Sequence, residues 1–364
     1  MVRSTLFALS FSALAAFSVS EAYASATGGL SNKERYAQAE ALRLGTGASQ
    51  DSASAFALMS DLARDGDSRA QARLAYYYLK GIGVDADPAA AAVWYEAAID
   101  AGRDSARTSY AKLLAAQGAG DAALAQLDKA SEAGLEKAQV LRATYHYQGK
   151  FGSASDADFG QAQLTDFATS GNMAAMQVVL AAMQKGASFD VDADLMTAQM
   201  LAFAREDQAK SGGKAAEALL RLWREQTDAQ SIALRTELVA HPSLRMRAKA
   251  EEGLLLAHAT HDPRAFRGAA EEIIAQTSGA DFNRAVYVVS RLDKNAYVHV
   301  LQEELKRRGY AVGPTTGIFN TRTMWAVVEF CQDTGIQAEC RLGPLRAKVI
   351  KVIVGELAEM TPGA

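Results

Sequence analysis

Proline and cysteine are both scarce in this sequence. Only 6 of its 364 residues are proline, while alanine is abundant throughout. Because alanine has the highest intrinsic helix propensity and proline the lowest, this composition favours a mostly helical chain. Two cysteines are too few for a disulfide-dense scaffold or a four-cysteine zinc site.

An excess of positive charge is also lacking. Lysine and arginine total 38 against 42 aspartate and glutamate residues, a net charge of −4. Dedicated nucleic-acid binders show a basic excess, so we expect no nucleic-acid partner. The hydrophobic fraction of 49% predicts a folded globular protein, and the length suggests two or three domains.

No recognised catalytic or nucleotide-binding motif occurs in the chain. It contains no Gly-x-Ser-x-Gly elbow, P-loop or His-Glu-x-x-His sequence. His258 and His261 stand about one helical turn apart, but no cysteine or acidic residue follows at a ligand spacing. The sequence therefore predicts no catalytic residues, no metal site and no cofactor.

The N-terminus carries the one long apolar run. A basic start at Met1–Arg3 precedes the apolar segment Leu6–Val19, and small-x-small sites follow at Ala22–Ala24 and Ala24–Ala26. This layout is typical of a secretory signal peptide at residues 1–26, with an uncleaved anchoring helix as the alternative. We expect an exported chain without a transmembrane segment in its mature form, periplasmic if the source is Gram-negative.

A repeat runs through the first half of the chain. The step Gly-x-x-x-Ala recurs at intervals of 36, 32 and 37 residues. Its four occurrences are Gly66/Ala70, Gly102/Ala106, Gly134/Ala138 and Gly171/Ala175. A period in this range is the signature of helical-repeat architectures, in which stacked helix pairs bury a shared core.

The clearest unit covers residues 70–106 and parses into two helices. The first is expected to end at Gly81, and Gly81 with Gly83 permits a tight loop. Asp87 is the expected N-cap of the second helix, and Pro88 suits its first position. The second helix then carries one apolar stripe: Ala91, Ala92, Trp94, Tyr95 and Ala98.

This unit resembles the Sel1-like repeat, a relative of the tetratricopeptide repeat. The matching residues include Leu74, Tyr78, Gly81, Gly83, Asp87, Ala91, Trp94, Tyr95, Ala98 and Gly102. The resemblance is weaker over 37–69, 106–138 and 138–175. It implies an all-α superhelix of antiparallel helix pairs, assigned to residues 27–190, with a concave surface for other macromolecules.

Residues 191–292 keep the helical pattern while the repeat fades. Apolar residues recur at three- and four-residue steps in 192–209, 213–226, 228–240, 243–258 and 263–276. Turns are expected at Ser211–Gly213 and Thr277–Gly279. We interpret this region as degenerate helical repeats; the alternative is a separate helical domain.

The last region has a different pattern. It runs Leu301-Gln302, Leu305, Gly309-Tyr310, a Gly/Pro-rich turn to Phe319, then Thr323, Ala326-Val327, Phe330 and Gly343-Pro344. This pattern resembles the peptidoglycan-binding-like three-helix domain, assigned to residues 293–357 before a tail at 358–364. It departs from the family at Thr316, Asn320 and Cys331. The candidate ligand residues around the turn are Tyr310, Thr316, Phe319, Asn320 and Arg322.

The two cysteines lie in this same region. Cys331 and Cys340 are nine residues apart in a chain expected to be exported. An intradomain disulfide between the second helix and the following loop is therefore predicted.

Taken together, these features predict a non-enzymatic exported adaptor. Its repeats would bind a protein partner, and its C-terminal domain would bind peptidoglycan. One alternative is a periplasmic regulator or scaffold of exopolysaccharide secretion or envelope signalling. Another is an accessory or unrecognised cell-wall hydrolase, because wall-binding modules often accompany hydrolases.

Overall fold

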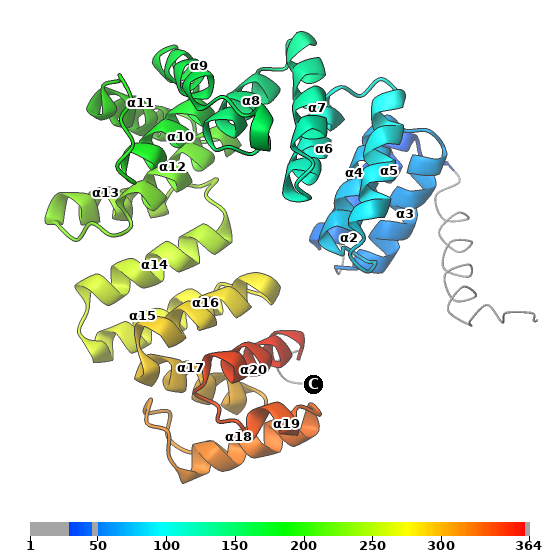
Figure 1. Cartoon of the computed structure of the whole chain (residues 1–364). Coiled ribbons are helices and arrows are strands. Elements are labelled where there is room, and N and C mark those ends of the chain that lie inside the picture. The colour runs from blue at the N-terminus through cyan, green and yellow to red at the C-terminus, as the bar shows by residue number, and fades with distance from the viewer. Residues whose placement is uncertain (1–28, 46–49, 361–364) are drawn as a thin grey trace, which may run out of the picture. The chain divides into compact units, whose positions relative to one another are not determined.

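The computed structural model describes residues 29–45 and 50–360, and over these ranges the chain is helical without a β-strand (Figure 1). The predicted all-α fold is thereby confirmed. The chain divides into two compact units, one up to Val178 and the other from Val179. The predicted signal peptide lies outside the described residues.

In the first unit, each helix packs against the next one along the chain, as in a helical-repeat solenoid. Its helices are α2 (Asn32–Leu44), α3 (Ser52–Arg64), α4 (Ser68–Lys80), α5 (Pro88–Asp100), α6 (Ser105–Ala116), α7 (Gly120–Glu132), α8 (Glu136–Tyr147), the short 3₁₀ helix η1 (Gly152–Ala154) and α9 (Ala157–Thr169). Helix α10 (Met173–Met183) spans the division between the units.

The core of the first unit is a row of small clusters between neighbouring helices. One cluster centres on Leu58, Leu74 and Tyr77, the next on Tyr95 and Tyr110. A third forms around Leu127 and Phe151. No single helix pair buries its apolar faces alone, so each pair depends on its neighbours for stability.

The second unit contains the helices predicted for residues 191–292. They are α11 (Ala193–Glu206), α12 (Lys210–Trp223), α13 (Ala229–Val239), α14 (Met246–Thr260), α15 (Pro263–Ala275) and α16 (Gly279–Leu292). The turn expected at Thr277–Gly279 separates α15 from α16. The turn expected at Ser211–Gly213 is wrong, because these residues lie inside α12.

The two glycines of α12 serve packing instead of a turn. A β-carbon on Gly212 would lie 1.7 Å from the carbonyl oxygen of Asp207, and one on Gly213 would lie 2.5 Å from that of Ser243. Glycine is therefore needed at both positions for close backbone approach within a helix.

The C-terminal region forms α17 (Lys294–Arg307), α18 (Thr321–Asp333), the short α19 (Gln337–Cys340) and α20 (Ala347–Glu359). The three predicted helices are present as α17, α18 and α20. They do not have a core of their own: Leu254, Phe266 and Val286 of α14–α16 belong to the same apolar cluster as Leu305 and Val354. None of the described helices is both long and apolar enough to cross a lipid bilayer.

Candidate binding sites in the repeats and the C-terminal region

The clearest repeat unit consists of α4 and α5, joined by a loop that its two glycines permit. Gly81 ends α4 with φ of +67°, and Gly83 follows with φ of +69°. The side chain of Asp87 accepts hydrogen bonds at 2.9 and 3.0 Å from the N–H groups two and three residues later, and Pro88 is the first residue of α5. The helix ends predicted for this unit are confirmed.

Each Gly-x-x-x-Ala step lies between the end of one helix and the start of the next. The four glycines have positive φ: Gly66 (+87°), Gly102 (+82°), Gly134 (+75°) and Gly171 (+91°). The paired alanines, Ala70, Ala106, Ala138 and Ala175, are at most 3% exposed. A left-handed helix end and a buried small residue in the next helix together bring consecutive helices into close contact.

Three consecutive tyrosines of α4 divide between the core and the surface. Tyr77 is fully buried, and its hydroxyl donates to Glu40 Oε1 at 3.0 Å. Burial and the charge of Glu40 raise the pKa of Tyr77 well above its usual range. Tyr76 and Tyr78 are half-buried, Tyr78 edge-on to the ring of Phe56 at 5.3 Å. These two residues are therefore the ones of the three that are partly exposed.

A buried glutamine fixes the turn of the C-terminal region. Gln302 of α17 is fully buried. Its amide nitrogen donates to Ile318 O at 3.0 Å and to Thr323 Oγ1 at 2.7 Å, and its amide oxygen accepts from Gly317 N at 2.9 Å. Because both ends of the amide are satisfied, the segment before α18 is held in one position. The sequence pattern included Gln302 but did not predict this role. The only local indication was a polar residue within the apolar pattern of α17.

Two of the five candidate ligand residues hydrogen bond to α18 through their side chains. The hydroxyl of Tyr310 donates to Asp333 Oδ2 at 3.0 Å, and burial together with that carboxylate raises the pKa of Tyr310 to about 12. Asn320 is the N-cap of α18, where its side chain accepts from Thr323 N at 3.0 Å. Their polar groups are thus already engaged within the chain.

The other three candidates lie at different places around the turn. Thr316 is exposed; its hydroxyl accepts a hydrogen bond from Ile318 N at 3.3 Å, and its carbonyl accepts one from Arg267 Nη1 at 2.7 Å. The exposed Arg322 lies beside Gly313. Phe319, half-buried, lines a cavity. Whether any of the five contacts a ligand remains a prediction.

That cavity, of about 430 Å³, lies beside α18 and α19 and is mostly apolar. Its lining residues are Phe319, Met324, Val327, Val328, Cys331, Gln332, Gln337, Cys340, Arg341, Gly343 and Pro344. Trp325, next to Met324 on α18, is 63% exposed. Exposed apolar side chains gathered beside a cavity are typical of a ligand or partner site.

The predicted disulfide is present and forms part of this cavity. It joins Cys331 of α18 to Cys340 at the end of α19. The link holds α19 against α18, so the cavity wall is covalently fixed.

One group of three side chains in the described part of the chain could in principle hold a metal ion. Donor atoms of Glu271, His299 and Glu303 lie within 4.8 Å of one another. His299 Nε2 is 3.0 Å from Glu271, its Nδ1 is 2.9 Å from Thr315 O, and Arg307 contacts Glu271 at 3.2 Å. Because a guanidinium already pairs with Glu271, the group is better described as an ion-pair cluster between α15 and α17.

Comparison with known proteins identifies two regions. Residues 68–102 match the family model of the Sel1 repeat, and residues 294–346 match that of a peptidoglycan binding domain. No curated protein matches the sequence significantly. The chain therefore contains a helix pair similar to the Sel1 repeat. Further along, residues 294–346 form a region similar to a peptidoglycan binding domain.

Two solved structures are similar at low identity. The Sel1 repeat protein from Oxalobacter formigenes is 19% identical, with a TM-score of 0.43 over 57% of this chain and 86% of its own. A protective antigen present in uropathogenic Escherichia coli strains, which displays an SLR fold, is 17% identical, with a TM-score of 0.38 over 91% of this chain and 80% of its own.

Proposed function

We propose that the chain is a non-enzymatic exported scaffold that holds a protein partner on its repeats and contacts peptidoglycan through α17–α20. The Sel1 repeat and peptidoglycan binding domain matches support this combination. The observation that carries the wall contact is the apolar cavity of about 430 Å³, whose lining includes the exposed Met324 and Val328.

The shared core of the second unit bears on how such a scaffold would work. Helices α17–α20 pack on α15 and α16 through one apolar cluster. A ligand bound at α18 would therefore be fixed relative to α14–α16, with no flexible linker between them. For the same reason, deleting the region from Tyr297 onward would expose Phe266 and Val286, so point variants test the proposal better than truncation.

Sedimentation with intact peptidoglycan sacculi tests the wall contact. The variant Trp325→Ala/Val328→Ser alters side chains that are 63% and 38% exposed, so the core is left intact. We expect its affinity for the sacculi to fall by at least tenfold, since each fully buried apolar side chain contributes roughly 1.5–3 kcal/mol to binding. Val93→Ser, at a position 62% exposed on α5, is the matched control and should bind like the parent chain. No sedimentation of the parent chain would contradict the wall contact.

Three further measurements test the remaining parts of the proposal. Pulldown from envelope extracts should capture a protein partner that is lost when Tyr76 and Tyr78 are changed to alanine. Release of soluble fragments from the sacculi would contradict a non-enzymatic role and favour a hydrolase. N-terminal sequencing of the chain from the exported fraction should begin near residues 25–27, and an intact Met1 would contradict cleavage.

A further inference from the structure

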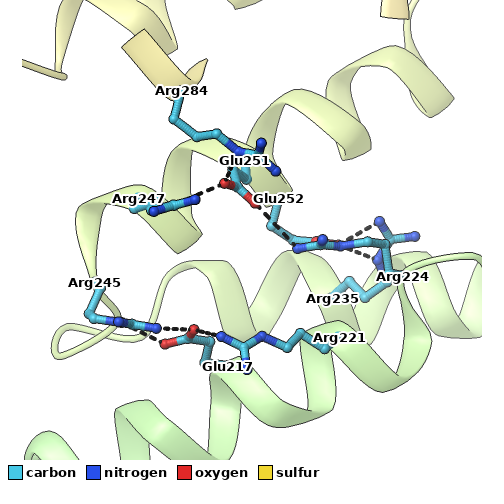
Figure 2. Close-up of polar contacts among 9 residues, drawn as sticks. All are labelled: Glu217, Arg221, Arg224, Arg235, Arg245, Arg247, Glu251, Glu252 and Arg284. Atoms are coloured by element: carbon cyan, nitrogen blue, oxygen red, sulfur yellow. Dashed lines mark hydrogen bonds and ion pairs between the residues drawn. The ribbon is translucent and has the colours of Figure 1, made fainter. Parts of the chain in front are cut away.

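An arginine-rich cavity lies in the second unit, away from the α18 cavity. Its volume is about 310 Å³, and its lining comes from α12, α14 and adjoining residues. Figure 2 shows the arginine-rich network at this cavity as two groups: Arg221 and Arg245 at Glu217, and Arg224, Arg235, Arg247 and Arg284 around Glu251 and Glu252. A concentration of positive charge stands out in a chain whose net charge is −4.

Three buried glutamates hold these arginines in place. Glu217 pairs with Arg221 and with Arg245, whose Nε donates to its Oε2 at 2.8 Å. Glu251 accepts from Arg284 at 2.6 Å and from Arg247 at 3.2 Å. The side chains of both glutamates are only 11–12% exposed.

The third glutamate lies deepest. Glu252 pairs with Arg235 at 2.5 Å, and both side chains are at most 2% exposed. Arg224 lies 3.4 Å from Glu252 and 3.7 Å from Glu251. Its buried Nε makes no hydrogen bond within the described part of the chain. The network thus links α12, α13, α14 and α16.

The glutamates do not neutralise the network. Six arginines face three glutamates, and Asp281, close enough to Arg245 to raise its pKa, still leaves two positive charges in excess. The side chains of Arg221, Arg245 and Arg247 are 64%, 69% and 57% exposed. Each donates to a single carboxylate, so several of the five N–H groups of each guanidinium face solvent.

We propose that this cavity binds the carboxylates of an acidic protein segment. The inference deepens the proposed scaffold function by giving the chemistry of a partner. Glu217 shows within the chain how a guanidinium here binds a carboxylate, because Arg245 donates hydrogen bonds from two nitrogens to its two oxygens. The carboxylate of a partner's aspartate or glutamate would accept hydrogen bonds from the remaining N–H groups. The buried glutamates would keep the guanidiniums oriented.

The arrangement favours several carboxylates over one compact polyanion. The exposed guanidiniums are anchored in two pairs: Arg221 and Arg245 share Glu217, and Arg247 and Arg284 share Glu251 (Figure 2). A peptide with spaced acidic side chains can meet the two pairs separately, with each pair still held on its glutamate. A single phosphate contacting both pairs would have to draw guanidiniums away from those glutamates.

Fluorescence anisotropy with the full chain tests the proposal. The probe is a labelled peptide of alternating glutamate and glycine, and the same peptide with glutamine is its neutral control. The variant Arg221→Gln/Arg247→Gln removes two charges while Glu217 keeps Arg245 and Glu251 keeps Arg284. The matched control, Arg64→Gln/Arg205→Gln, removes two arginines that are 67% and 50% exposed elsewhere.

The glutamate peptide should bind, and the cavity variant should weaken it by about tenfold or more, because hydrogen bonds to charged groups are the strong ones. The control variant should change its affinity by less than about twofold. Equal losses in both variants, equal binding of the glutamine peptide, or tighter binding of a phosphoserine-glycine peptide would each overturn the proposal. Thermal unfolding of both variants checks their fold.

The experiment separates this inference from the scaffold function. Binding of the glutamate peptide by a chain that captures no envelope protein would contradict the scaffold function alone. Capture of an envelope protein without binding of the peptide would contradict this inference alone.

Discussion

Gly83 lies so close to Ser52 that a β-carbon on Gly83 would be 2.0 Å from the Ser52 carbonyl oxygen. Ser52 is the first residue of α3, so the loop of the α4–α5 pair rests on the start of the preceding helix. Gly81, in the same loop, has only ordinary contacts of 3.4 Å or more around its β-carbon position. The two glycines of one motif therefore have different roles.

Alanine substitutions should separate these roles. Gly81→Ala places a side chain at φ of +67° without a clash and should lower the free energy of unfolding by about 1–2 kcal/mol. Gly83→Ala adds a backbone clash to the same conformational penalty and should cost about 3 kcal/mol or more. Urea unfolding followed by circular dichroism measures both values. Equal costs would mean that the contact between the loop and α3 is absent in solution.

Two helix-interior glycines provide a second comparison. A β-carbon on Gly160 of α9 would lie 2.3 Å from Tyr147 N, whereas Gly268 of α15 has open space around it. Gly268→Ala should raise the free energy of unfolding by about 0.5–1 kcal/mol, because alanine is the better helix former. Gly160→Ala should lower it by about 2 kcal/mol or more despite the same gain in propensity. Stabilisation by both substitutions would contradict the close packing of α8 and α9.

The glycines also show why the helices were predictable and some of their details were not. The ends of α4 and α5 follow from residues adjacent in sequence, such as Asp87, and local chemistry sufficed to place them. Gly212 and Gly213 looked like a turn, because a glycine pair carries the same local signal in both settings. Gly213 is needed because of the carbonyl of Ser243, thirty residues further along, which no local pattern contains, while Gly212 meets the carbonyl of Asp207 just before the helix.

Reduction of the Cys331–Cys340 disulfide should destabilise the second unit. The bond closes a loop of about ten residues, for which the chain-entropy model gives roughly 2.5 kcal/mol. Cys331→Ala/Cys340→Ala should lower the melting temperature of the oxidised protein, and added reductant should not lower it further. An unchanged melting temperature in the double variant would show that packing alone holds α19 on α18. The parent chain with and without reductant is the control.

The C-terminal region was predictable as a set of helices and less so as a site. Its family pattern located α17, α18 and α20, because these helices follow from their own apolar spacing. The core shared with Phe266 and Val286 was hidden, since it depends on how α15 and α16 pack. Tyr310 and Asn320 stood out as polar residues beside a turn, but their partners, Asp333 and Thr323, engage them inside the chain. The exposure of Trp325 likewise required the helix to be placed.

The arginine-rich network should make the second unit sensitive to acid. Burial alone would raise the pKa of Glu217 and Glu251, but the hydrogen bonds and charges of their arginines outweigh it and hold both values below 4.5. A carboxylate whose pKa is lower in the folded chain stabilises it above the unfolded pKa, and this contribution is lost as pH falls through the folded value.

We therefore expect the free energy of unfolding to be steady near neutral pH and to fall below about pH 4.5. Glu217→Gln should lower the free energy of unfolding by roughly 1 kcal/mol at pH 7, because solvent around the exposed arginines screens the ion pairs. Below pH 4.5, the free energy of unfolding of this variant should fall less steeply than that of the parent chain. Some loss of stability in acid should remain, because other carboxylates, such as Asp228, also have a lowered pKa in the folded chain. Glu132→Gln, at an exposed position, should leave the curve unchanged. Urea unfolding at a series of pH values measures the free energy for each chain. An equally steep fall below pH 4.5 in Glu217→Gln would show that the arginines do not hold this carboxylate in solution.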